Sequence, residues 1–146
     1  MAEIFKNHAW LCAVSAWFAA QALKLLISWA LHDQLDWHKF VSAGGMPSSH
    51  SAMVVALTLS IGIQDGFDSS LFAACFVLAA IVMYDAAGVR RETGRQGQAI
   101  NQILQSAIFD GRPISNTEMK EIVGHTPLEV FGGFLLGVVC ALVWNI

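Results

Sequence analysis

The chain has 146 residues, of which 55% are hydrophobic and 13% are charged, and its formal net charge is -3. A soluble domain carries about 25% charged residues, so this composition disfavours a soluble protein and indicates a membrane protein. No basic surface with interleaved aromatic residues suggests nucleic-acid binding. The cysteines lie in apolar runs and have neither metal-ligand spacing nor the pattern of a disulfide framework (Cys12, Cys75 and Cys140).

Four apolar segments follow one another along the chain, at residues 9–31, 47–63, 71–88 and 127–144. Each approaches the roughly 17–25 residues that a membrane-spanning helix needs. They predict an all-α membrane bundle of about four transmembrane helices, forming one domain over residues 1–146. A very apolar soluble helical domain is the alternative. The first segment is too long for a signal peptide and has no clear cleavage site, so we expect a retained helix.

A long polar interval separates the third and fourth segments. Its first half spaces apolar residues at a near-helical period, between Val89 and Ile108, with glutamines and asparagines between them. This pattern predicts an amphipathic helix at the membrane interface or on the bundle. A turn at 110–113 and a short helix at 116–123, stopped by Gly124, are expected to follow.

Basic residues give a prediction of the membrane topology. With four spans, the loops at 32–46 and 89–126 share one side, and they hold nearly all the basic residues (Lys39, Arg90, Arg91, Arg95, Arg112 and Lys120). The other side holds Lys6. The positive-inside rule therefore places both loops in the cytoplasm and both termini outside. We expect a bacterial inner membrane or an organelle membrane of bacterial origin.

The first chemical cluster precedes the second segment and reads Gly-Gly-Met-Pro-Ser-Ser-His at residues 44–50. Pro47 suits the first position of a helix. The N–H groups of Ser48, Ser49 and His50 would then form an anion site at the helix N-terminus. A simple loop-to-helix junction with serine caps is the competing interpretation.

The second cluster starts the fourth segment with His125 and places Glu129 four residues later. Residues four apart share one helix face, so the carboxylate can orient the imidazole and leave its other nitrogen to attack. Thr126 and Glu129 also fit a capping box, with Pro127 at the first helical position. Both roles could hold at once.

The third cluster ends the third segment, on the same side as the other two. Arg90 and Arg91 could clamp a phosphate or anchor the helix at the interface. Asp85 lies deeper, where a carboxylate without a partner is costly, and it could orient one of these two arginines. Lys24 lies within the first segment, at a depth that favours a functional role, and it could snorkel to the interface.

These motifs resemble the type-2 phosphatidic acid phosphatase superfamily. Met-Pro-Ser-Ser-His at 46–50 is similar to its Pro-Ser-Gly-His motif, and residues 125–133 resemble its last motif. The stretches GGMPSSHSA and MYDAAGVRR look like its divergent branch, related to acid phosphatases and vanadium-dependent haloperoxidases. The resemblance spans residues 24–137.

The resemblance implies a role for each matched residue. His125 corresponds to the histidine that becomes phosphorylated, Glu129 to its orienting acid and His50 to the general acid. Ser48 and Ser49 correspond to phosphate-binding positions, Lys24 to the lysine of the first motif. No metal or other cofactor is implied. Two family arginines are missing, since Leu31-His32 and Met119 occupy their regions. Arg90 and Arg91 are our candidates to replace them.

The sequence therefore predicts a membrane lipid phosphatase that acts through a phosphohistidine. Phosphatidylglycerophosphate, phosphatidic acid and isoprenyl phosphates all fit as substrates, and a homo-oligomer stays open. One alternative is a non-catalytic membrane scaffold or anion-binding protein that retains the fold. A small transporter is a weaker alternative, supported only by Lys24 and Asp85.

Overall fold

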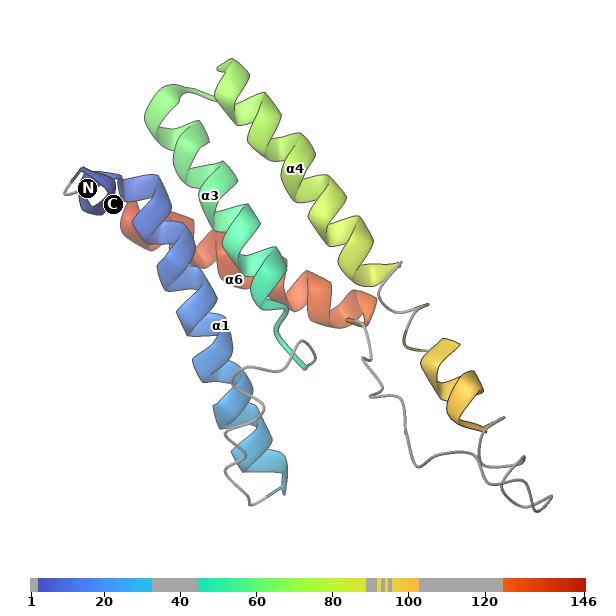
Figure 1. Cartoon of the computed structure of the whole chain (residues 1–146). Helices are drawn as coiled ribbons and strands as arrows, with labels where there is room; N and C mark the ends of the chain where they lie inside the picture. The colour runs from blue at the N-terminus through green and yellow to red at the C-terminus, as the bar shows by residue number, and fades with distance from the viewer. Residues whose placement is uncertain (1–2, 33–44, 89–91, 93, 95, 103–124) are drawn as a thin grey trace, which may run out of the picture.

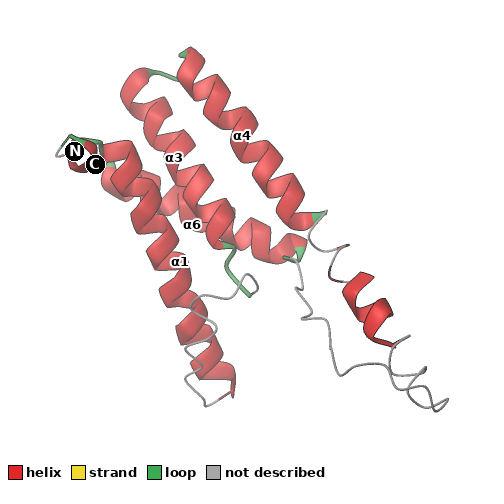
Figure 2. Ribbon diagram, in the orientation of Figure 1, coloured by secondary structure: helices red, strands yellow, loops and turns green. Residues whose placement is uncertain are grey.

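The computed structural model describes residues 3–32, 45–88, 92, 94, 96–102 and 125–146. Four long α-helices dominate these residues: α1 (His8–His32), α3 (Ser49–Asp65), α4 (Ser70–Ala87) and α6 (Pro127–Trp144) (Figure 1). A short 3-10 helix, η1 (Ile4–Lys6), precedes α1. Figure 2 shows helices and loops and no strand among the described residues. The predicted all-α class is confirmed, with helix bounds within about two residues of those expected.

Helix α3 occupies the centre of the bundle. It packs on α1, α4 and α6, whereas α4 packs mainly on α3 and touches α6 only slightly. The two chain termini lie together at one end of the bundle (Figure 1). The starts of α3 and α6 and the end of α4 lie toward the other end, which is where the predicted chemical clusters fall.

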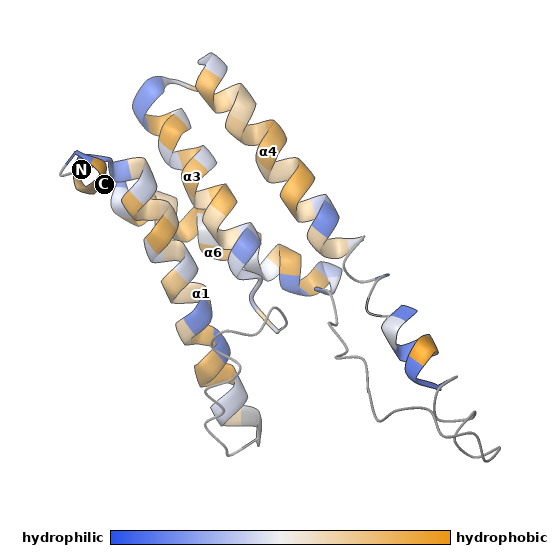
Figure 3. Cartoon of the chain, in the orientation of Figure 1, coloured by the Kyte–Doolittle hydropathy of each residue, from blue (hydrophilic) through white to orange (hydrophobic). Residues whose placement is uncertain are grey.

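The helices have the length and composition of membrane spans. Residues His8–Ala30 of α1, all of α4 and all of α6 are long and apolar enough to cross a bilayer. Helix α3 has 17 residues, one fewer than α4 or α6, and it is the most enclosed of the four. Figure 3 shows hydrophobic residues over most of the four helices. The chain is thus a polytopic membrane helix bundle of about four spans.

Small residues line the contacts between α1, α3 and α6. They recur at every fourth position of each helix: Cys12, Ala16 and Ala20; Ala52 and Ala56; Gly133, Gly137 and Ala141. Small side chains let helix backbones approach closely, which is how membrane helices gain packing energy without a hydrophobic effect between them. A Cβ on Gly137 would lie 2.7 Å from the carbonyl oxygen of Ala52. This close approach brings the start of α3 against the first turns of α6.

Capping residues define where the helices begin. Ser48 is the N-cap of α3, and its Oγ accepts a hydrogen bond of 3.4 Å from the N–H of Ser51. The prediction that Pro47 occupies the first helical position is therefore wrong. A serine hydroxyl can accept a hydrogen bond from an N–H of the first turn, whereas a proline ring cannot, so the helix begins after Ser48.

The interval between α4 and α6 is described only in part. Residues 96–102 are helical, which agrees with the predicted amphipathic helix, and this segment lies apart from the four-helix bundle in Figure 1. Its place at the membrane interface stays a prediction. The turn at 110–113 and the helix at 116–123 lie outside the described residues, as do the six basic residues of the two loops that were used for the topology.

Candidate active site

The start of α3 and the residue before α6 bring two histidines together. The ring centroids of His50 and His125 are 5.9 Å apart, with the ring planes at 89°. This separation lies within the roughly 5–8 Å expected for histidines on either side of a phosphoryl group undergoing in-line transfer. However, the rings meet edge to face, so the space between them is already filled. His125 is only 1% exposed and His50 is half-buried, so His50 is the ring with room to turn aside.

A backbone hydrogen bond joins the two motifs directly. The N–H of Ser48 donates to the carbonyl oxygen of Glu129 at 2.9 Å. The expectation that the Ser48 N–H contributes to an anion site is therefore wrong, because α6 supplies its acceptor. Ser49 and His50 occupy the first two positions of α3, where N–H groups point out of the helix toward its N-terminus. An anion site here would be built from those two amides.

Lys24 projects from α1 into this end of the bundle. Its side chain is 5% exposed, and Nζ donates a hydrogen bond of 3.5 Å to the Oγ of Ser49. The side chain therefore points into the bundle, and its expected reach toward the membrane interface stays a prediction. The ammonium group also interacts electrostatically with Glu129. A buried ammonium is costly without such partners, so Lys24 adds a positive charge where the two motifs meet.

Glu129 forms the capping box that the sequence predicted. Its Oε2 accepts a hydrogen bond of 2.8 Å from the N–H of Thr126, and its own N–H donates to the Thr126 Oγ1 at 3.3 Å. Pro127 occupies the first turn, as expected. The capping box uses one carboxylate oxygen and holds the group near Lys24. The second expected role, orienting His125, stays a prediction.

Asp85 lies at the end of α4, next to the histidine of α3. A cavity of about 250 Å³ is lined by His50, Ile81, Val82, Asp85 and Ala86. The structure therefore brings Asp85 to the wall of a cavity that His50 also lines. The sequence suggested that Asp85 orients Arg90 or Arg91, but both arginines lie outside the described residues.

Two buried polar residues of α1 were not identified from the sequence as candidate site residues. Gln21 is 4% exposed and Ser28 is 7% exposed, and both are buried with Lys24 along one side of the helix. Their offsets of three and four residues from Lys24 place all three on one helix face. Their spacing within an otherwise apolar segment could have identified them in the sequence as one polar face of the helix.

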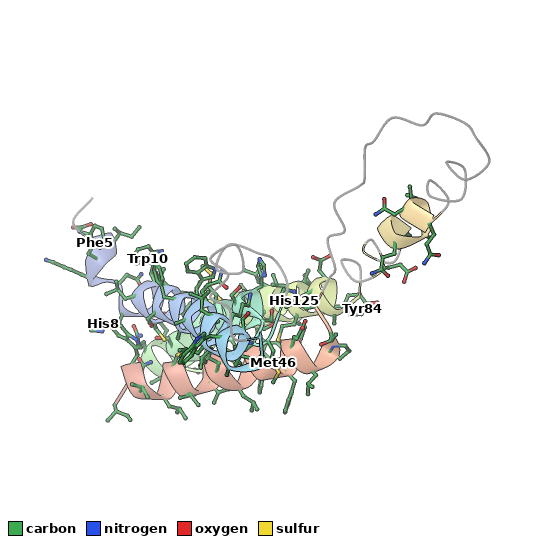
Figure 4. The ribbon with its side chains drawn as sticks, turned by 90° about the horizontal axis from the view of Figure 1, so that it is seen from below. Phe5, His8, Trp10, Met46, Tyr84 and His125 are labelled. Carbon is green, nitrogen blue, oxygen red and sulfur yellow. The ribbon has the colours of Figure 1, made fainter. Side chains whose placement is uncertain are left out.

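Figure 4 shows where the labelled side chains lie along the bundle. Met46, Tyr84 and His125 lie toward one end, whereas Phe5, His8 and Trp10 lie toward the other. Lysine, serine and histidine side chains from α1, α3 and the start of α6 therefore converge at a single end. Imidazole, hydroxyl and ammonium groups are side-chain groups that phosphoryl transfer can use.

Comparisons with known proteins identify the family of this chain. Residues 5–140 match the divergent PAP2 family. The chain is also 38% identical over 151 residues to the uncharacterized membrane protein YuiD of Bacillus subtilis (strain 168), an alignment that covers 97% of this chain and 96% of that protein. No solved structure matches the chain. Because the family match covers α1, α3, α4, most of α6 and both histidine motifs, the chain belongs to the divergent PAP2 family.

Proposed function

We propose that this protein is a lipid phosphate phosphatase that uses His125 as its nucleophile and His50 as its general acid. One observation carries the proposal: two histidines from separate helix starts lie 5.9 Å apart, and Ser49, the residue before His50, accepts a hydrogen bond from the buried Lys24. Family membership points to the same phosphatase-related superfamily. The reaction is hydrolysis of a phosphomonoester or pyrophosphate without a metal ion or other cofactor.

The reaction proceeds in two steps. In the first, a ring nitrogen of His125 attacks phosphorus, the bond from phosphorus to the lipid oxygen breaks, and His50 gives its proton to that oxygen. The lipid alcohol leaves and a phosphohistidine remains. In the second, His50 takes a proton from water, the water oxygen attacks phosphorus, and the phosphorus–nitrogen bond breaks. Inorganic phosphate leaves and both histidines return to their first state.

The His50 side chain must turn before the substrate binds, because its ring now contacts His125 edge to face. The cavity of about 250 Å³ beside His50 gives it space to do so. Asp85 lines the same cavity and can hold the turned imidazole in one orientation. The phosphoryl group then occupies the position between the two rings.

Positive charge and N–H groups stabilise the transferring phosphoryl group. Lys24 supplies the charge, and Ser49 supplies its hydroxyl and its backbone N–H at the first position of α3. Because the family's usual arginines are absent, Arg90 or Arg91 completes this set in the proposal. Glu129 orients His125 through the carboxylate that already caps α6.

A lipid is the substrate class that suits the location. The candidate site lies at the ends of helices that are long enough to span a bilayer, and phosphate headgroups lie at that depth. Phosphatidylglycerophosphate, phosphatidic acid and isoprenyl phosphates share the required phosphate. By the positive-inside rule, this end of the bundle faces the cytoplasm.

Phosphate release from purified protein tests the proposal. The wild type and His125→Ala are incubated in nanodiscs with each of the three lipid phosphates, and inorganic phosphate is measured. We expect turnover of at least one lipid by the wild type and none by the variant. An acid-labile, alkali-stable phosphoprotein should form in the wild type only. Phosphate binding without turnover would instead identify an anion-binding protein that retains the fold.

A further inference from the structure

We propose that an apolar groove between α4 and α6 binds the hydrocarbon chain of the lipid phosphate. The groove has a volume of about 460 Å³ and is lined by Met83, Tyr84, Pro127, Val130, Phe131 and Phe134. Ligand sites in proteins generally fall in the range of roughly 300–1,000 Å³. This inference rests on the proposed function, and it identifies the residues that would contact the hydrocarbon chain of the substrate and select its length.

The groove exists because α4 and α6 hardly touch. Among the described residues, α4 packs mainly on α3 and approaches α6 at only a few positions. The α6 residues that line the groove recur at spacings of three and four, which makes them one continuous helix face. Its two phenylalanine rings, Phe131 and Phe134, stack 6.3 Å apart at 12° and form a flat apolar wall.

The groove and the candidate active site share the end of α4. Met83 and Tyr84 line the groove, while Asp85 and Ala86 line the cavity beside His50. On α6, Pro127 lines the groove two residues after His125. One end of the groove therefore lies beside the start of α6, whereas on α4 the residues of the groove and those of the cavity occupy opposite faces of the helix, because successive residues point about 100° apart. Figure 4 shows Tyr84 and His125 toward the same end of the molecule.

The lining favours a hydrocarbon over a polar ligand. All six lining residues present aliphatic or aromatic carbon, and the one hydroxyl belongs to Tyr84, which is 78% exposed. Tyrosine with an apolar ring and a polar tip is typical of the headgroup level of a membrane. A hollow of similar size at the other end of the bundle, about 420 Å³, has a mixed lining in which Lys6, Gln64 and Asp65 lie among apolar residues. The more apolar of these two hollows is thus the one that reaches Pro127, two residues after His125.

Substituting Val130 with Trp would fill the groove and tests the inference. Activity is measured with short-chain, water-soluble and long-chain, bilayer-forming versions of the lipid phosphate that the wild type hydrolyses fastest. We expect the ratio of kcat/KM for the long to the short substrate to fall about tenfold, which equals ~1.4 kcal/mol or the burial of roughly two methylene groups. Leu135→Trp is the matched control, because Leu135 is an exposed residue of α6 that does not line the groove.

The control should keep the wild-type ratio. If Val130→Trp fails to fold, Phe134→Ala removes one aromatic wall and should lower the same ratio. An unchanged ratio in a folded groove variant would overturn the groove while leaving the phosphatase proposal standing. A wild type that hydrolyses neither substrate would refute the proposed function itself. A photoreactive benzophenone side chain at position 134 should crosslink to long-chain lipid phosphate in vesicles, and crosslinking mainly to a second copy of the chain would assign the groove to a dimer interface.

Discussion

Ser48 and Glu129 are joined by a hydrogen bond from the Ser48 N–H to the Glu129 carbonyl oxygen, 2.9 Å long. This bond connects the N-cap of α3 to the first turn of α6, and each of these helix starts carries a histidine of the candidate site. The distance between His50 and His125 therefore depends on how closely α3 and α6 pack. The proposed chemistry is for this reason sensitive to residues that never touch the substrate.

The small residues of α6 should control that packing. A Cβ on Gly133 would overlap the carbonyl oxygen of Ser48 and lie 2.9 Å from the Cβ of Ser51. We expect Gly133→Ala to lower the free energy of unfolding by about 1–3 kcal/mol, as overpacking does, and to abolish turnover. Thermal unfolding in detergent and phosphate release are the measurements. Gly132→Ala is the control, because its Cβ would meet the end of the flexible Met46 side chain at 3.1 Å. Equal tolerance of both changes would contradict the close packing.

Lys24 should be required for turnover and not for folding. Lys24→Met keeps most of the side-chain volume and removes the charge near Ser49 and Glu129. We expect kcat/KM to fall about 100-fold, since one stabilising group of this kind contributes roughly that much. The free energy of unfolding should stay the same or rise, because the variant no longer has to remove a charge from water when it folds. Lys6→Met, at an exposed position in η1, is the control. Near-normal turnover of Lys24→Met would remove this residue from the site.

Glu129 has a capping role and a proposed catalytic role, and a pair of variants separates them. Glu129→Gln retains an oxygen that can accept from the Thr126 N–H, so unfolding should change little, while the loss of charge should strongly reduce kcat. Thr126→Ala removes the hydroxyl that caps the Glu129 N–H, and it should cost about 1 kcal/mol of stability with turnover largely kept. If Glu129→Gln hydrolyses lipid phosphate normally, the carboxylate acts only as a cap.

The proposed mechanism makes a further prediction about metals and vanadate. Activity should be unchanged in excess chelator, because a histidine nucleophile and a lysine supply what a metal ion would. Vanadate should inhibit, since it adopts a five-coordinate geometry like that of phosphorus during transfer. Phosphate release is measured with each addition. Loss of activity in chelator, restored by magnesium or zinc, would refute the metal-independent mechanism.

The arginine pair after α4 should divide into one residue that binds phosphate and one that does not. Adjacent residues on a helix point about 100° apart, so one of Arg90 and Arg91 can face the site squarely. Replacing that arginine with Lys keeps the charge and loses the bidentate contact, so its kcat/KM should fall well below that of its neighbour's variant. Each variant is the control for the other. Normal turnover by both would shift attention to Arg95 or Arg112.

The amino-acid sequence by itself determined the helices and their order. Apolar runs of near bilayer length predict membrane helices wherever they fall, and the predicted bounds of α6 agree with those observed. Thr126, Pro127 and Glu129 likewise predict the start of α6, because a capping box forms within four consecutive residues. Local interactions of this kind depend on nearby residues only, so a single sequence is enough to read them.

Only the tertiary structure decided what the helices bring together. Lys24 turns inward to Ser49 because the small residues of α1, α3 and α6 leave room for close approach there, and no local pattern around Lys24 specifies that direction. The amide of Ser48 looked available in the sequence, yet the Glu129 carbonyl takes it once α6 packs against α3. The edge-to-face contact of His50 and His125 arises in the same way. Each of these contacts joins residues from different helices, and its geometry is set by how the helices pack rather than by the preferences of any one segment.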